Sequence, residues 1–482
     1  MEEQQLLGAC RDGKVEEVKQ LLNTSNINLN CQDKENDDRT PLDYACRNGH
    51  IEIVKLLLND KRVDINKANK NGATPFYVAC YQGYIEIVKL LLNDNRVEIN
   101  KANNGDATPF YVACQNGCIE IVKLLLNDQR VDINKVDNDG WTPFSLACWN
   151  GHIEIVKLLL NDQSVDINKT NKNETTPFHI ACQEGHIEIV KLLLNDQRVD
   201  INKANNNGAT PFYIACYKGH IEIVKLLSND KRIDINKGNK NDATPFYIAC
   251  QFGHIEIVKL LLNDNRVDIN QERNDGSTPF LIACEKGHIE IVKLLLNDQR
   301  VDINKAQIEG ATPFYIVCQE GHIEIVKLLL NDERVDINKA KNDGVTPFFI
   351  ACGKGHIEIV KLLLNDQRID INQTMNTGET PFLIACQEGH IESVKLLLNT
   401  ERVDINKAQN QSATPFYIAC QEGHIEIVKL LLNDQRVDIN KGVKDGRTPF
   451  WIACYQGHID IVLLFLETSI GNFFFSKITK FF

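Results

Sequence analysis

The sequence predicts an all-α repeat solenoid, in which helix–turn–helix repeats are joined by β-hairpin or turn loops and stack into a curved rod. Two observations carry this prediction. The string HIEIVKLLLND occurs eight times, first at 50–60 and last at 424–434. Threonine–proline pairs recur every 34 residues from Thr40 to Pro449 and account for all 13 prolines. A helix repeated so closely is the interior of a stack, because one short repeat cannot bury it alone.

The elements of one repeat follow in order through residues 134–168. Residues 138–140, Asn-Asp-Gly, predict a tight turn, since these residue types tolerate a positive φ. Thr142 is expected to cap a short first helix, with Pro143 at its first position and Gly151 ending it. The buried side chains of this helix are expected to be Phe144, Leu146, Ala147 and Cys148.

The second helix of this repeat is predicted over 153–160, where six of the eight residues are apolar. Glu154 and Lys157 form its polar stripe at i, i+3 spacing. A helix with so narrow a polar stripe must be covered on several sides. Neighbouring repeats of the same sequence can provide that cover, which explains why the string recurs.

The order of these elements resembles the ankyrin repeat. Turn, Gly-x-Thr-Pro, short helix, Gly-His, Ile-Val-x-Leu-Leu-Leu and Val-Asp-Ile-Asn follow one another, and the family pattern includes T-P-L-H-x-A at a period near ~33. The resemblance covers nearly the whole chain and implies right-angled β-hairpins with antiparallel helix pairs. Two departures stand out. The repeat is one residue longer, because LLLNDQRVDIN replaces a glycine-terminated link, and the histidine of the motif is present only as His179.

The N-terminal end predicts a capping repeat over residues 1–35. In this first repeat Glu17 and Gln20 occupy the positions that Ile87 and Leu90 hold later in the chain. A terminal repeat has no neighbour on one side, so we expect these polar residues to face water. Ankyrin-type repeats 2 to 14 are then expected over residues 36–469.

The C-terminal end, 470–482, is predicted to be an apolar tail. The last repeat carries Leu463 in place of the usual lysine and adds Phe465, so its end is too apolar to face water. We expect the tail to form a cap helix that begins at Asn472 and packs on this end through Phe474, Ile478 and Phe481. The alternative is a disordered or membrane-surface tail, in which Lys477 and Lys480 accompany an amphipathic helix.

Composition limits the partners and the location. Lysine and arginine number 53 against 65 acidic residues, and the net charge of -12 argues against a nucleic-acid partner. The first ten residues lack the basic and apolar segments of a secretory signal. Fourteen of the 16 cysteines follow the repeat, and equivalent cysteines on neighbouring helices lie too far apart to bridge. We therefore expect reduced, buried thiols in a cytoplasmic protein, with the nucleus as the other location considered.

Catalytic chemistry is not indicated. The sequence has no nucleotide-binding or nucleophile motif, so we expect no enzyme activity and no cofactor. The spacing of Cys182 and His186 suggests a pair of metal ligands. However, the cysteine belongs to the first helix and the histidine to the turn, and structural zinc needs four converging ligands. We therefore predict no metal site.

Recognition is expected where the repeats differ. Variation gathers before each Thr-Pro and each Gly-His pair, and the proteins that this one resembles bind partners there, on the concave face. Aromatic side chains dominate interface hot spots. We therefore predict partner contacts at Trp141, Trp149, Tyr81, Tyr217 and Phe252. The alternative is that these rings pack against neighbouring repeats.

An acidic edge is the second candidate surface. Its residues either attract a basic partner or remain solvated, as most surface carboxylates do. They are Glu184, Glu285, Glu320, Glu388 and Glu422.

Two functions fit these patterns. The first is an adaptor or scaffold that binds proteins in its concave groove through aromatic residues of repeats three to seven. The second is a structural or multivalent rod, on the order of 140 Å long, that binds a repetitive partner. Near-identical repeats favour the rod, and the unevenly placed aromatic residues favour the adaptor. We expect a monomer, with the tail as the one candidate for membrane contact.

Overall fold

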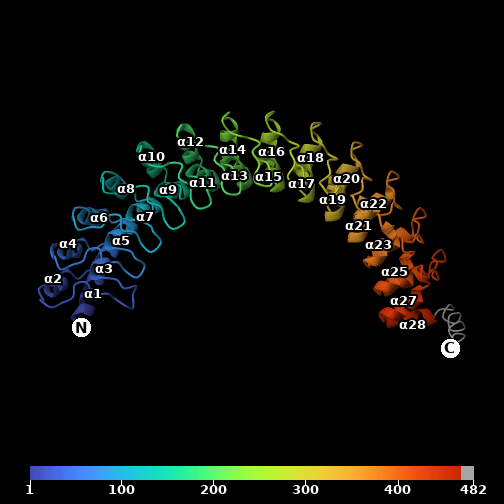
Figure 1. Ribbon diagram of the computed structural model, residues 1–482, viewed down its shortest axis with the longest axis horizontal. Coiled ribbons are helices and arrows are strands. Elements are labelled where there is room, and N and C mark those ends of the chain that lie inside the picture. Colours follow the sequence, from blue (N-terminus) through green and yellow to red (C-terminus); the bar gives the residue numbers. More distant parts are fainter. Residues whose placement is uncertain (468–482) are drawn as a thin grey trace. The chain divides into compact units, whose positions relative to one another are not determined.

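The computed structural model describes residues 1–467. The tail at 470–482, with its predicted cap helix, therefore lies outside the described residues. The chain divides into two compact units, Met1–Lys240 and Asn241–Phe482, which we call the N-terminal and the C-terminal unit. Each unit consists, in its described part, of consecutive pairs of short helices, one pair per repeat (Figure 1).

The N-terminal unit contains helices α1 to α14. The first helices of its repeats are α1 (Glu2–Asp12), α3 (Pro41–Arg47), α5 (Pro75–Gln82), α7 (Pro109–Gln115), α9 (Pro143–Trp149), α11 (Pro177–Glu184) and α13 (Pro211–Lys218). The second helices are α2 (Val15–Leu22), α4 (Ile51–Asn59), α6 (Ile85–Leu92), α8 (Ile119–Leu126), α10 (Ile153–Asn161), α12 (Ile187–Asn195) and α14 (Ile221–Ser228).

The C-terminal unit contains helices α15 to α28 in its described part. The first helices are α15 (Pro245–Gln251), α17 (Pro279–Glu285), α19 (Pro313–Glu320), α21 (Pro347–Lys354), α23 (Pro381–Gln387), α25 (Pro415–Glu422) and α27 (Pro449–Gln456). The second helices are α16 (Ile255–Leu262), α18 (Ile289–Leu296), α20 (Ile323–Leu330), α22 (Ile357–Asn365), α24 (Ile391–Leu398), α26 (Ile425–Leu432) and α28 (Ile459–Glu467).

Each first helix from α3 to α27 begins at the proline of a Thr-Pro pair. The threonine hydroxyl accepts a hydrogen bond from the backbone three residues later, as Thr142 does from the Ser145 N–H at 3.0 Å. Proline suits the next position because no hydrogen bond is needed from it there. After the helix, Gly151 adopts a φ of 75°, and a Cβ at this position would lie 2.8 Å from the His186 ring. The predicted cap, start and end of this helix are confirmed.

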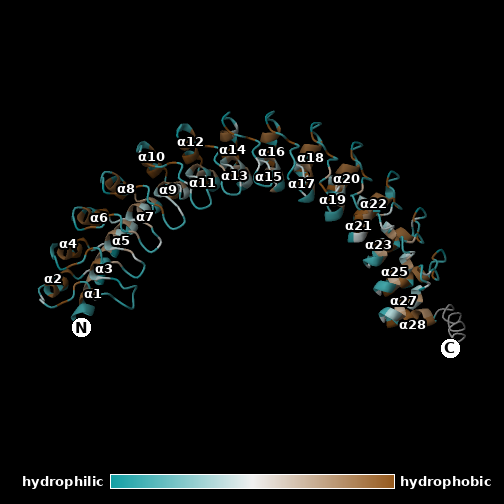
Figure 2. Ribbon diagram, in the orientation of Figure 1, coloured by the Kyte–Doolittle hydropathy of each residue, from teal (hydrophilic) through white to brown (hydrophobic). Residues whose placement is uncertain are grey.

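The core of each unit lies between its two rows of helices. First helices contact first helices of the next repeat, and second helices contact second helices. Figure 2 shows hydrophobic residues along the second helices, and hydrophilic residues in the loops and over parts of the first helices. In the repeat of α9 and α10, Phe144, Cys148, Ile155 and Leu159 are buried. Because burial of one such apolar side chain contributes about 1.5–3 kcal/mol, neighbouring repeats stabilise one another.

The loops predicted as β-hairpins or turns form turns, and the strands of a β-hairpin do not form among residues 1–467. Among residues 1–467 no strand forms, and the one isolated β-bridge joins Asp33 to Arg39. Later turns are closed by two backbone hydrogen bonds, such as the Asn103 N–H donated to the Ala107 carbonyl and the Asp106 N–H donated to the Asn103 carbonyl, both at 3.0 Å. In the N-terminal unit, side-chain oxygens of Asn and Asp accept further N–H groups of the turn, as Asn103 does from Gly105 and Ala107.

The loop after the second helix is braced by two side chains of the segment NDxRVDIN. Arg96 is bonded to Asp94 and also donates to the Leu58 carbonyl of the preceding repeat at 2.9 Å. Asn66 donates to the Arg96 carbonyl at 2.7 Å and accepts from the Glu98 N–H at 2.8 Å. These contacts recur along both units, so the lengthened loop links each repeat to the next.

At the N-terminal end, the two polar residues of the first repeat differ in exposure. Gln20 is exposed, whereas the Glu17 side chain is 28% exposed and accepts a hydrogen bond from Gln5 at 2.7 Å. The equivalent Ile53 and Ile87 of later repeats are fully buried. Glu17 therefore occupies a position that an inner repeat would bury, in agreement with the role of a cap, which stays a prediction.

The last described repeat leaves apolar side chains exposed. Phe465 is buried against Phe416 and Phe450, with ring centroids 5.9 and 5.5 Å away. Leu463 and Ile459 remain 50% and 70% exposed. All 16 cysteines are free, and fourteen of them are buried. The expectation of a fully buried cysteine ladder is wrong at Cys454, which is exposed because no described repeat follows its helix.

Candidate functional site

Trp141 and Trp149 lie next to each other at the two ends of one first-helix segment. Trp141 precedes the Thr142 cap of α9, and Trp149 is the last residue of that helix. Their ring centroids are 5.1 Å apart with an interplanar angle of 88°, an edge-to-face pair. Trp149 is 39% exposed, whereas Trp141 is half-buried. The two predicted anchors therefore form one aromatic surface.

Trp141 is held from behind by a small apolar cluster. Ala107, Tyr111 and Leu146 are its buried members, and Tyr77 and Trp141 pack against them. The Tyr111 hydroxyl donates a hydrogen bond to the Asp137 carboxylate. That carboxylate also accepts a hydrogen bond from the backbone N–H of Trp141 at 2.8 Å. The alternative prediction, that these rings pack against neighbouring repeats, therefore describes Trp141 better than Trp149.

Tyr81, Trp149 and Tyr217 share one register in the N-terminal unit, near the ends of α5, α9 and α13. Tyr81 is 49% exposed and Tyr217 is half-buried, with the Lys218 ammonium 5.5 Å from its ring centroid. The repeats between them carry Gln115 and Gln183 at this register. Sequence reasoning missed this alternation, although the 68-residue spacing of the three aromatic residues is its signal.

Phe252 lies outside this register and in the C-terminal unit. It follows α15 at the position after Gln251, is 45% exposed, and stacks on His254 with centroids 6.5 Å apart. The structure therefore groups four of the five predicted anchors in the N-terminal unit and leaves Phe252 in the other unit.

A ladder of histidines fixes the backbone at this register. The Nε2 atom of His186 donates to the Trp149 carbonyl at 2.9 Å, and that of His152 donates to the Gln115 carbonyl at the same distance. Sequence reasoning assigned these histidines only to a turn. The other members of the ladder are His50, His220, His288, His322, His356, His390, His424 and His458.

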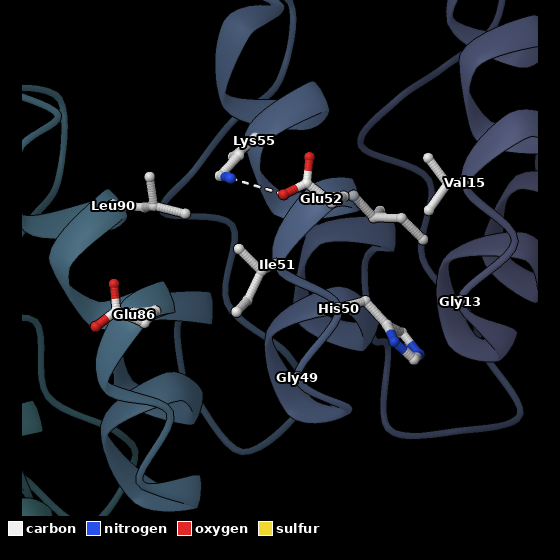
Figure 3. Close-up of a pocket in the computed structure, with 10 residues that line it drawn as sticks. Gly13, Val15, Gly49, His50, Ile51, Glu52, Lys55, Glu86 and Leu90 are labelled. Carbon is white, nitrogen blue, oxygen red and sulfur yellow. Dashed lines mark hydrogen bonds and ion pairs between the residues drawn. The ribbon is translucent and has the colours of Figure 1, made fainter.

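At the N-terminal histidine, a hollow of about 520 Å³ lies beside the second helices. Figure 3 shows His50 beside Gly13 and the ion pair between Lys55 and Glu52, which spans 2.6 Å. Ile51 and Leu90 line the same hollow. Because this Ile, Glu and Lys recur at the same positions in the second helices from α4 to α26, the hollow resembles the surface of the other repeats there.

A second hollow of about 300 Å³ lies on the first-helix side of the same unit. Tyr77 and Tyr81 form its aromatic wall, and Asn69 and Asn103 contribute amides. Arg47 also lines it, and its guanidinium is 3.3 Å from the Asp43 carboxylate. Burial raises the pKa of Asp43 against the opposing effect of Arg47. Tyr81, one of the predicted partner-contact residues, is therefore an exposed ring that borders a cavity.

The residues of the acidic edge contact their own neighbours. Glu184, Glu320, Glu388 and Glu422 each accept from the preceding glutamine, and Glu285 pairs with Lys286 at 2.7 Å. Only Glu285 has its charge compensated by a lysine, and the other four carboxylates keep their charge while they accept an amide N–H.

The ring of the motif histidine His179 makes no hydrogen bond. It is fully buried on α11, and neither ring nitrogen has a hydrogen-bond partner. Burial lowers its pKa to about 4. Tyr77 and Tyr213, at the same register, receive hydrogen bonds from Asn103 and Asn239 at 3.1 and 3.0 Å.

Within residues 1–467, no group of three or more His, Cys, Asp or Glu side chains is placed to hold a metal ion. Burial raises the pKa of the repeat cysteines, Cys182 among them, so these thiols stay protonated near neutral pH. In the same part of the chain, no helix is long and apolar enough to cross a membrane.

Family comparison covers almost the whole chain. A model described as "Ankyrin repeats (3 copies)" matches residues 6–103, 95–171, 163–239, 231–307, 299–375 and 369–442. A second, described as "Ankyrin repeats (many copies)", matches residues 422–466. No curated protein matches the chain.

Proposed function

Because the chain belongs to the ankyrin repeat family, whose members are generally non-catalytic protein-interaction modules, we propose that it is an adaptor or scaffold. Its partner contacts lie on the first-helix side of the N-terminal unit. The observation that carries this proposal is the edge-to-face pair of Trp141 and Trp149, whose outer ring is 39% exposed.

Physical reasoning supports a contact at this pair. A tryptophan ring buries a large area while few rotatable bonds are immobilised, so truncation of a central ring weakens binding by about 2 kcal/mol or more. The Trp149 backbone is held by His186 and the Trp141 ring by its apolar cluster. Little conformational freedom therefore remains to be lost when a partner binds, which favours affinity.

The test is quantitative affinity capture with the full chain and with a Trp141→Ala, Trp149→Ala variant. A matched control changes Trp451 and Tyr455 to alanine, since this second ring pair is stacked with centroids 5.0 Å apart in the last repeat. We expect specific proteins to be enriched, lost with the first variant and kept with the control. Proteins that stay bound to the first variant, with circular dichroism unchanged, would contradict the proposal.

The multivalent rod is the second candidate. The observation that favours it is the identity of the eight HIEIVKLLLND strings, which presents the same exposed Glu and Lys pairs along both units. A repetitive ligand would bind such a surface through many weak contacts. In the capture experiment this function predicts a partner that neither pair of alanine substitutions releases. It also predicts binding that falls steeply as repeats are removed.

A further inference from the structure

Along the N-terminal unit, one register alternates between aromatic and amide side chains. The order is Tyr81, Gln115, Trp149, Gln183 and Tyr217, one residue per repeat, and we call these five residues the ring row. The rings of Tyr81 and Trp149 and the amide of Gln115 are exposed, and the other two members are half-buried. In the C-terminal unit the register holds no such alternation, because Gln, Glu and Gly fill it from Gln251 to Gln421.

The spacing of the ring row matches one peptide conformation. Neighbouring first helices pack about 8–10 Å apart, so consecutive members of the row lie about that far apart. A polyproline II helix has three residues per turn and rises about 3.1 Å per residue, so it presents the same face every ~9.3 Å. One turn of the peptide therefore corresponds to one repeat, and two turns correspond to the distance between rings.

The amides between the rings favour the same partner over an α-helix. A polyproline II backbone makes no internal hydrogen bonds, so its carbonyl groups are available to donors from outside. The carbonyl groups of an α-helix are taken up within the helix. An amide such as that of Gln115 thus meets an acceptor on the first partner and none on the second, while aromatic rings stack on prolines.

The charges near the ring row also fit a neutral segment. None of the five members is charged at neutral pH. Glu184 accepts a hydrogen bond from Gln183 at 2.8 Å, and Arg47, beyond the Tyr81 end, is paired with Asp43. Lys218 lies against the Tyr217 ring. These three ionic groups already have contacts within the chain, and an uncharged partner complements the row.

We propose that the ring row binds a proline-rich segment in the polyproline II conformation, with prolines six residues apart stacked on Tyr81, Trp149 and Tyr217. This inference rests on the proposed protein-binding function and names the chemistry of the partner. Twelve residue steps of polyproline II span about 37 Å, within the ~32–40 Å expected for four repeats. A segment of thirteen residues is thus the shortest that contacts all three rings.

The test uses fluorescence anisotropy with the full chain and a labelled peptide of thirteen prolines. We expect saturable binding that weakens at least tenfold when the peptide is shortened to four prolines. Trp149→Ala weakens binding at least tenfold, and Gln115→Ala weakens it severalfold. Tyr455→Ala, at the same register in the last repeat but outside the row, leaves binding unchanged. Circular dichroism of each variant checks that the helices are intact.

Three results would overturn the inference. They are equal binding of a thirteen-residue Gly-Ser peptide, retention of the proline peptide by Trp149→Ala, and tighter binding of an amphipathic helical peptide of the same length. The proposed function fails by a different route. If affinity capture loses its proteins with the tryptophan variant while no proline peptide binds, the protein-binding function stands and the polyproline partner is wrong.

Discussion

The turns before the Thr-Pro pairs are built differently in the two units. From Asn69 to Asn205 each turn begins with Asn or Asp, whose side-chain oxygen accepts the N–H groups two and four residues later. For Asn103 these donors are Gly105 at 2.9 Å and Ala107 at 3.1 Å. In the C-terminal unit the same position holds Arg273, Gln307, Lys341, Met375, Gln409 and Val443.

We call the two hydrogen bonds accepted by the Asn or Asp side chain the brace. The difference between the units teaches that the turn also forms without this brace. The Gln307 N–H is donated to the Ala311 carbonyl at 3.0 Å, the same backbone bond that closes the turn at Asn103. Once the brace is absent, the position can carry a long side chain. Arg273 and Lys341 lie over the rings of Tyr247 and Tyr315, at 5.5 and 5.7 Å from the centroids. This position thus holds short Asn or Asp side chains from Asn69 to Asn205, and longer or apolar side chains, two of them cationic, from Arg273 to Val443.

The largest effect that sharpens this comparison is expected at His179. The C-terminal unit has Leu281 and Leu383 at this register, both fully buried, whereas His179 is buried without a partner. Its pKa is lowered to about 4 by burial, so the unfolded chain binds the proton more tightly than the folded one. Stability at α11 is therefore present above pH 6.5 and falls as the pH drops toward 4. Between pH 7 and pH 5 the loss is about 2 kcal/mol.

Hydrogen exchange of the α11 amides at pH 7 and pH 5, corrected for the intrinsic exchange rate, measures this loss. The control is His179→Leu, which copies the residue of the C-terminal unit and removes the titrating group. We expect its α11 protection to be nearly the same at both pH values. An equal loss in the wild type and in His179→Leu would show that another group controls the acid sensitivity.

An intermediate effect is expected from removing the brace itself. Asn103→Ala deletes two acceptor bonds and the donor bond to the Tyr77 hydroxyl, so local stability should fall by about 1–1.5 kcal/mol. Gln307→Ala should change it by less than about 0.5 kcal/mol, because the glutamine accepts only a 3.4 Å contact from Ser277. Hydrogen exchange of the two turns measures both. Similar losses in the two variants would remove the distinction between the units.

Sequence reasoning predicted the features that depend on local residue type. The Thr142 cap, the helix start at Pro143 and the left-handed Gly151 each follow from the residue at that position. Features that depend on a second repeat were missed. The acceptor of His186 is the Trp149 carbonyl, 37 residues away, and no pattern within one repeat indicates that contact.

For the candidate site, too, the sequence indicated individual residues but not the contacts between repeats. Trp149 and Tyr81 are exposed near the ends of their helices, whereas Tyr217 at the same register is half-buried. Trp141 is half-buried since Tyr111 and Leu146, from two repeats, lie behind it. The alternation of the ring row appears in the sequence only when residues of one register are compared across repeats, because adjacent members are 34 residues apart.

The smallest effect is expected for Lys341→Met. The lysine side chain is 19% exposed and lies 3.5 Å from Glu309 and 3.7 Å from Asp343, and such partly solvated pairs contribute little. Its contact with the Tyr315 ring is worth about 0.5–1 kcal/mol, and a methionine replaces part of it by apolar packing. Met375 already occupies this position one repeat later and packs against the Tyr315 cluster. We therefore expect a change in local stability within about 0.5 kcal/mol, measured by hydrogen exchange of residues 341–349. A loss as large as that of Asn103→Ala would mean that the C-terminal turns depend on their long side chains as the N-terminal turns depend on their braces.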